Sequence, residues 1–257
     1  MSLVRTLKTR LLPPKKVQTM RSRTDGKYPR LGYDEEELAV AAVRIVDDNT
    51  MTSYQRLVTL WNQIRYLDRA GIPGCLVECG SWKGGSSGMM ALAHKASGPV
   101  SRHLHVFDSF QGLPEPDADH DGVVSIDYAS GKAAGRMETI GKCVGTRAEN
   151  ETLILNTIAY PKELARFHEG WFQDTVPVEA PTLGPIALLR LDGDWYESTK
   201  VCLDHLFKLV SPKGIVVIDD YGHWEGCRKA TDEFLAKLPY KPMLHFIDGT
   251  GRYLQTP

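Results

Sequence analysis

The sequence is poor in cysteine and has no long apolar run. Its 257 residues include five cysteines, an odd number, and none of them forms a CxxC pair or a His/Cys cluster at zinc-ligand spacing. This usage argues against a disulfide-stabilised secreted scaffold and a structural zinc site, and we expect reduced thiols in a cytoplasmic protein. No segment offers about 18 consecutive apolar residues, the length that a membrane-spanning helix needs. We therefore expect no membrane partner.

The chain also has little net charge of either sign. Its 31 Lys and Arg nearly balance its 32 Asp and Glu, which argues against nucleic-acid binding over the whole surface. The charge is unevenly placed, however, because residues 1–31 hold nine Lys or Arg and one Asp. This basic arm, from Arg5 to Arg30, has no apolar run of about 7–15 residues as a secretory signal would. We expect a mobile or partner-contacting tail rather than a nucleic-acid contact.

What remains is ordinary for a folded domain, with 42% hydrophobic and 25% charged residues. From residue 53 onward, apolar runs alternate with helical patterns. The pattern predicts strands at 75–80, 104–108, 165–169, 186–191 and 215–218, helices at about 53–70, 84–95, 149–158, 196–210 and 223–238, and a closing antiparallel hairpin of 243–247 with 252–255.

This alternation predicts an α/β fold, a doubly wound and mainly parallel sheet with helices on both faces. Ligands of such sheets bind at the carboxyl ends of the strands. We divide the chain into an N-terminal arm and lead-in segment over 1–50 and one domain over 51–257. A polar stretch rich in Pro and Gly, at about 111–135, predicts a lid-like insertion in that domain.

A glycine-rich turn follows the first predicted strand. It runs ECGSWKGG from Glu78 to Gly85, which lets a ligand approach the backbone but matches neither the G-x-G-x-x-G fingerprint nor a phosphate-binding P-loop. Glu78 ends this strand and Asp108 ends the next. A carboxylate at such a position can accept both ribose hydroxyls, so the pair indicates a small nucleoside cofactor. A purely structural turn is the alternative.

Four carboxylates follow two later strands. Asp192 and Asp194 come after one strand, and Asp219 and Asp220 after the next. Like charges about 4 Å apart repel by about 4 kcal/mol at an effective dielectric constant near 20, so the group favours a cation. Oxygen ligands without Cys or His select a hard ion, Mg²⁺ before Ca²⁺. Adjacent strand residues point to opposite faces, so Asp219 and Asp220 can share an ion only if the strand breaks between them. Helix caps and solvated turns are the alternative.

Two histidines lie in predicted site loops. His120 belongs to the lid stretch, where Asp117 to Gly122 imitates the first half of a calcium-binding loop but Tyr128 replaces the required glutamate. A lid over the active site is the better interpretation of this stretch. His223 follows the last acidic pair. Either histidine is a candidate for an auxiliary base or a substrate contact.

Together, several motifs resemble the macrocin O-methyltransferase (TylF/MycF-like) family, which methylates sugar hydroxyls of glycosylated natural products. The resemblance covers most of residues 50–235. The matching segments are Glu78-x-Gly80-x-Trp82-x-Gly84-Gly85, Phe107-Asp108-Ser109-Phe110-Gln111-Gly112, Gly170-Trp171-Phe172-x-Asp174-Thr175, Leu191-Asp192-Gly193-Asp194 and Ile218-Asp219-Asp220-Tyr221.

The resemblance implies a class I, Rossmann-like methyltransferase that uses S-adenosylmethionine (SAM) and acts on a glycosylated small molecule in antibiotic biosynthesis. It implies Mg²⁺ on Asp192, Asp219 and Asp220, and a homo-oligomer with the N-terminal arm at an interface. The implied SAM-binding residues are Thr50, Met51, Glu78, Gly80, Ser81, Trp82, Gly84, Gly85, Asp108, Ser109, Phe110, Trp171 and Asp192.

Methyl transfer requires that a hydroxyl oxygen attack the sulfonium methyl in line and lose a weakly acidic proton. An ion that binds two neighbouring sugar hydroxyls would position one of them and lower its pKa, as it lowers that of bound water from about 15.7. Asp192 then acts through the ion, and Asp194, near the ion but not on it, is the candidate base.

Three other functions stay open at this point. A catechol or phenol O-methyltransferase would use the same SAM and Mg²⁺ machinery with an aromatic acceptor pocket. A nicotinamide oxidoreductase would share the architecture, but the sequence lacks its glycine fingerprint. A non-catalytic SAM-binding module would bind the cofactor and transfer nothing, and the acidic cluster argues against it.

Overall fold

The computed structural model describes residues 35–257, so the predicted basic arm lies outside the described residues. Within them the strands form a seven-stranded sheet in the order β3-β2-β1-β4-β5-β7-β6. β1 to β5 run parallel, and β7 pairs antiparallel with both β5 and β6. The doubly wound sheet and the C-terminal hairpin are thereby confirmed. The strands are β1 (Cys75–Cys79), β2 (Leu104–Asp108), β3 (Ala165–Glu169), β4 (Ile186–Leu191), β5 (Val210–Ile218), β6 (His245–Phe246) and β7 (Arg252–Gln255).

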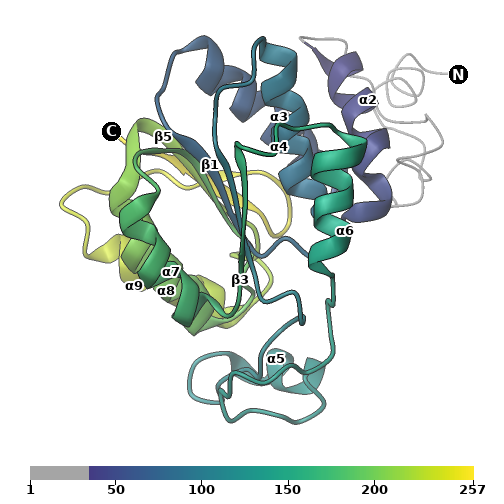
Figure 1. Ribbon diagram of the computed structural model, residues 1–257. Helices are drawn as coiled ribbons and strands as arrows, with labels where there is room; N and C mark the ends of the chain where they lie inside the picture. Colours follow the sequence, from purple (N-terminus) through teal and green to yellow (C-terminus); the bar gives the residue numbers. More distant parts are fainter. Residues whose placement is uncertain (1–34) are drawn as a thin grey trace, which may run out of the picture.

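Helices cover both faces of this sheet (Figure 1). One layer holds α2 (Glu36–Val46), α3 (Tyr54–Arg69), α4 (Gly85–Ser97) and α6 (Arg147–Glu151), which continues as the π-helical turn η4 (Thr152–Thr157). The other holds α7 (Phe172–Glu179), α8 (Tyr196–Leu206) and α9 (Glu225–Ala236). Short 3₁₀ turns are η3 (Asp47–Asn49), η5 (Ala180–Thr182) and η6 (Phe207–Leu209).

The central strands are apolar because both of their faces are buried. Successive side chains of a strand point to opposite faces, and accordingly Leu76 and Leu188 belong to the core beneath α3 and α4, whereas Val77 and Leu189 belong to the core beneath α8. The near-continuous apolar runs of the sequence follow from this double burial.

The helix predicted after residue 53 forms as α3. The Ser53 hydroxyl caps it by accepting the N–H of Arg56 at 3.2 Å, which satisfies one of the free donors of the first turn. The whole predicted apolar stripe is buried, namely Leu57, Leu60, Trp61, Ile64 and Leu67.

Helix α2 was not predicted from the sequence. It lies in the segment that we assigned to the lead-in over 1–50, but Ala39, Val43 and Val46 are buried in the same core as α3, and the helix contacts α3 and α4. The folded body therefore begins before residue 51.

The predicted lid projects past the carboxyl ends of the strands (Figure 1). It contains helix α5 (Gly122–Tyr128), and antiparallel bridges join Pro114 to Thr139 and Asp117 to Ala134. Asp121 belongs to the segment that imitates a calcium-binding loop. Its side chain is buried and accepts the backbone N–H groups of Asp117 and Tyr196. This carboxylate thus ties the lid to α8. Among the described helices, none combines the length and hydrophobicity that crossing a bilayer would require.

Candidate active site

A cavity of about 300 Å³ opens at the carboxyl ends of the parallel strands. Four strand ends meet there because each parallel pairing continues one residue past its strand: the N–H of Gly80 bonds to Phe107, that of Asp192 to Cys79 and that of Asp219 to Leu191. This is the position at which doubly wound sheets bind ligands.

The glycine turn after β1 forms one wall of the cavity. Gly80 has φ +91°, and a Cβ there would overlap the carbonyl oxygen of Asp192, so only glycine fits where β1 and β4 end side by side. The turn is fastened to β2 by Asp108, whose Oδ2 accepts the N–H groups of Ser81 at 2.7 Å and Trp82 at 3.1 Å. The Oδ1 of Asp108 accepts the N–H of Phe110 at 2.7 Å. Burial raises the pKa of Asp108, and these donors oppose the rise.

About half of the predicted cofactor residues line the cavity, namely Met51, Gly80, Trp82, Asp108, Ser109, Trp171 and Asp192. The others lie behind this wall in the described structure. Ser81 and Phe110 bond to Asp108, Gly85 begins α4 and lies against Thr50, and Gly84 lies against Asn150. These residues shape the turn without lining the cavity.

Glu78 is placed differently from the nucleoside-binding role that its strand-end position suggested. Its side chain is fully buried and does not line the cavity of the described structure. Its Oε1 accepts Nη1 of Arg190 at 2.5 Å, and its Oε2 accepts the Ser87 hydroxyl. Glu78 precedes the end of β1 and points into the layer beneath α4, so strand alternation turns it away from the ligand.

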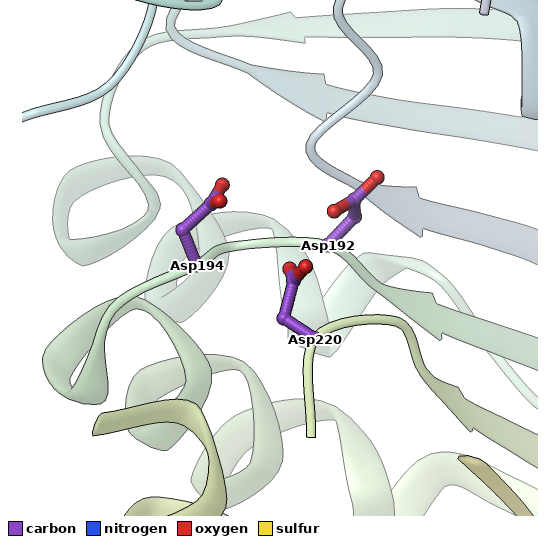
Figure 2. A group of neighbouring side chains, drawn as sticks. All are labelled: Asp192, Asp194 and Asp220. Atoms are coloured by element: carbon purple, nitrogen blue, oxygen red, sulfur yellow. The ribbon is translucent and has the colours of Figure 1, made fainter. Parts of the chain in front are cut away.

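Three carboxylates converge on the cavity from two loops, as Figure 2 shows. Asp192 and Asp194 follow β4 and Asp220 follows β5, and one oxygen from each lies within 4.8 Å of the other two. Within the described chain, Oδ2 of Asp220 is buried and has no hydrogen-bond partner. Burial, together with the neighbouring carboxylates, raises the pKa of Asp194 and Asp220. A cation would relieve both the missing partner and the repulsion.

Asp219, predicted as a metal ligand, lies outside this group of three. Its Oδ1 accepts Nη2 of Arg190 at 2.6 Å, and its Oδ2 is paired with Arg56. The physical reason is strand alternation: Asp219 points toward the face that carries Arg190, whereas Asp220 points toward the cluster. Asp194 is the third carboxylate of the cluster, although the sequence analysis placed it near the ion and not bound to it.

Two arginines of the site were not predicted. Arg190 is 2% exposed and bonds to Glu78 and Asp219, and it also pairs with Asp192 at 2.9 Å. Arg56, from the first turn of α3, lines the cavity and pairs with Asp219 and Asp248. Arg190 is the single charged residue in an otherwise apolar strand, and this was the available signal.

Of the two candidate histidines, only His223 lines the cavity in the described chain. His120 stacks on Tyr196, with ring centroids 4.3 Å apart, and its Nδ1 lies 3.5 Å from Asp117. It sits in the lid but does not face the cavity.

The wall opposite the glycine turn was missed from the sequence. It is built from the lid residues Leu113, Pro114 and Tyr128, from Cys143 in the segment after the lid, and from Trp224 at the start of α9. Trp224 packs against Tyr128, with ring centroids 5.5 Å apart, and donates its Nε1–H to Oδ1 of Asp194 at 2.7 Å. This contact fixes the side chain of Asp194, whose backbone has φ +59°.

Fold and site together define the class of this protein: a glycine turn and a strand-end aspartate beside an acidic cluster, on a doubly wound sheet, are the parts of a Rossmann-like O-methyltransferase. Residues 14–256 match the macrocin-O-methyltransferase (TylF) family. The chain belongs to this family, which confirms the resemblance drawn from its motifs.

Relatives and solved structures agree with this assignment. The chain is 38% identical to the 8-demethyl-8-(2,3-dimethoxy-alpha-L-rhamnosyl)-tetracenomycin-C 4'-O-methyltransferase of Streptomyces olivaceus, over 79% of this chain and 74% of that one. It is 32% identical to the mycinamicin III 3''-O-methyltransferase of Micromonospora griseorubida, over 80% and 77%. The structure of the O-methyltransferase NovP matches with a TM-score of 0.68 and 28% identity, over 98% of this chain and 93% of that one. The chain is therefore an O-methyltransferase, as predicted.

Proposed function

We propose that this protein transfers the methyl group of SAM, with the help of Mg²⁺, to a sugar hydroxyl of a glycosylated natural product. The observation that carries the proposal is that the glycine turn and the acidic cluster line one cavity. The relative from Streptomyces olivaceus, whose name specifies a rhamnosyl tetracenomycin and its 4'-O-methylation, supports a sugar acceptor.

The residues on the glycine-turn side fit a nucleoside cofactor. Asp108 offers a carboxylate at the end of β2, and Gly80 lets a ligand approach the backbone. Met51, Trp82 and Trp171 add apolar surface to the same wall. SAM, bound there, would supply an electrophilic methyl group on sulfur. We assign Ser109 to the same site, and Glu78 to support of the turn from behind.

The acidic cluster fits a hard cation, because all of its donors are carboxylate oxygens and one of them is buried without a partner in the described chain. The site allows two sets of three ligands, and both include Asp192 and Asp220. The third ligand is Asp219, as the sequence suggested, or Asp194, which lies in the cluster. Mg²⁺ in this place would polarise the acceptor hydroxyl and help to orient it.

Asp194 is the residue that we assign to proton removal. Its Oδ1 is held by the indole N–H of Trp224, which leaves Oδ2 for the acceptor. With SAM bound, methyl transfer from sulfur to the hydroxyl oxygen would release the hydroxyl proton, and Asp194 would accept it. Tyr128 and Trp224 line the cavity beside this carboxylate. His223, in the same cavity, is the second candidate.

The family resemblance further supports a homo-oligomer with the N-terminal arm at an interface, and the cysteine usage supports a cytoplasmic location. Both stay predictions for this chain.

The function can be tested by incubating the purified protein with SAM and two acceptor panels, glycosylated polyketides or macrolides and free catechols. We expect a mass gain of one methyl group on a glycoside, and none in excess EDTA until Mg²⁺ is restored. Calorimetry with S-adenosylhomocysteine (SAH) should give binding with and without EDTA, because the glycine turn and the acidic cluster follow different strands. Methylation of catechols alone would favour the phenol-type enzyme, and full turnover in EDTA would reject the metal.

A further inference from the structure

The glycine turn is held in shape by residues far away in the sequence. Trp82, at its centre, has φ +49°, a left-handed conformation that a residue with a Cβ adopts at a cost. Such a conformation persists only where surrounding contacts impose it. Asp108 binds the N–H side of this residue, so another group must hold the carbonyl side.

That group is Asn150, in helix α6. Its side chain is fully buried, and its Nδ2 donates to the carbonyl oxygen of Trp82 at 2.7 Å and to that of Thr146 at 3.1 Å. Asn150 also lies against the next part of the turn, because a Cβ on Gly84 would fall 2.6 Å from its Oδ1. The amide of Asn150 therefore contacts the turn at two places, the carbonyl of Trp82 and the residue Gly84.

Asn150 is itself held in place by the start of α6. Thr146 and Glu149 form a reciprocal capping box, in which each side chain accepts the backbone N–H of the other, and this fixes the first turn of the helix. Glu149 additionally pairs with Lys83 of the glycine turn at 3.1 Å. The helix end and the turn thus form one rigid contact.

We propose that Asn150 is a positioning residue for the cofactor, which keeps the turn in its binding geometry before SAM arrives. The proposal rests on the cofactor site proposed above. Without the amide, the Trp82 carbonyl loses the donor that holds it, and the turn relaxes toward conformations that Trp82 prefers. Cofactor affinity then falls by the fraction of time that the turn spends in the binding geometry.

The test is the affinity for SAH, measured by calorimetry on the full chain. We expect Asn150→Ala to bind SAH about tenfold more weakly, as for a turn that is competent about one-tenth of the time. Asn150→Ser should do the same while keeping a helical bond to the Thr146 carbonyl four residues earlier, so it isolates the contact to Trp82 and replaces the alanine variant if that one does not fold. The Michaelis constant for SAM should rise in parallel, with kcat at saturating SAM nearly unchanged.

Ser211→Ala is the matched control. Ser211 is buried and donates to the carbonyl of Pro73 at 2.7 Å, a cross-element bond to backbone at the start of β5, the end opposite the cavity. This variant should keep the wild-type affinity for SAH. Unchanged affinity in folded Asn150→Ser, or an equal loss in Ser211→Ala, would overturn the proposal. Failure of the wild-type protein to bind SAH would instead reject the cofactor site itself.

Discussion

Asp219 and Asp220 are adjacent in the chain but lie in opposite electrostatic surroundings. Both oxygens of Asp219 face guanidinium groups, those of Arg190 and Arg56. Asp220 faces Asp192 and Asp194 and has a buried oxygen without a partner in the described chain. Asp219 is therefore compensated by the protein itself, whereas Asp220 depends on a proton or a cation.

Single-residue variants separate the base from the ligands. Asp194→Asn removes one charge and keeps a residue that tolerates a left-handed backbone. If Asp194 is the base, kcat should fall by about 10²- to 10⁴-fold, while the affinities for SAH and Mg²⁺ stay close to those of the wild type. Steady-state turnover at saturating SAM, calorimetry with SAH and a Mn²⁺-binding titration measure the three quantities.

Asp219→Asn is the comparison that assigns the third ligand. If Asp219 binds the ion, this variant should require more Mg²⁺ for half-maximal activity and Asp194→Asn should not. The reverse pattern would make Asp194 a ligand. A loss in kcat of Asp194→Asn below about threefold, far under the range for general-base catalysis, would reject it as the base and leave His223.

The strands that are buried on both faces could be predicted from sequence, because their own apolar residues mark where they begin and end. β2 and β4 form over the predicted residues, because short strands that are buried at every position leave little choice of boundary. β3 also forms over its predicted residues, although it is a half-exposed edge strand. The acids at the carboxyl ends could be predicted as a group, since parallel strands end at one edge. α2, α5 and α7 were missed: α5 is short, α7 contains Pro177, and α2 lies in the segment assigned to the lead-in.

The orientation of each acid could not be predicted, because it depends on partners far away in the chain. Glu78 turns inward to Arg190, which is 112 residues away, and the wall opposite the turn comes from the lid and from α9. No local pattern encodes these contacts. The sequence showed which residues reach the edge of the sheet, and tertiary packing decides which of them face the ligand.

Strands β2 and β3 carry a histidine pair that should make stability depend on pH. Nδ1 of His105 lies 3.0 Å from Nε2 of His168, and Nδ1 of His168 lies 3.6 Å from Glu179. Burial, with His168, His103 and Arg166 nearby, lowers the pKa of His105 from 6.5 to about 3. The folded state therefore keeps His105 neutral where the unfolded chain binds a proton.

The free energy of unfolding should consequently decrease as the pH falls below about 6.5. The contribution of His105 is fully present above the unfolded pKa and is lost toward its folded pKa, by up to about 1.4 kcal/mol per pH unit. Urea denaturation of the wild type and of His105→Gln between pH 7 and pH 5 measures this slope. The variant should show the smaller slope, and His205→Gln, on α8, controls for the loss of one imidazole. Equal slopes in wild type and His105→Gln would contradict the prediction.

At the scale of the whole molecule, the cavity lies between two parts that are fastened differently. The glycine turn belongs to the sheet and is held by β2 and α6. The opposite wall belongs to the lid, and two hydrogen bonds anchor its base: Trp195 donates its Nε1–H to the carbonyl of Pro114 at 2.9 Å, and the N–H of Tyr196 bonds to Asp121 at 2.7 Å. Ring contacts of His120 with Tyr196 and of Tyr128 with Trp224 add to them. The acceptor side of the cavity therefore depends on these anchors more than the cofactor side does.

Asp121→Ala should accordingly weaken the binding of the acceptor and spare that of the cofactor. The change leaves the buried N–H of Tyr196 and the N–H of Asp117 without the carboxylate that accepts them, so the lid spends less time in the position where Tyr128 lines the cavity. We expect the Michaelis constant for the glycoside to rise about tenfold, as for a lid in place one-tenth of the time, with SAH affinity nearly unchanged. Asp119→Ala, an exposed aspartate of the same lid, should leave both quantities as in the wild type. A fall in SAH affinity as large as the rise in the Michaelis constant would show instead that lid and cofactor turn move as one body.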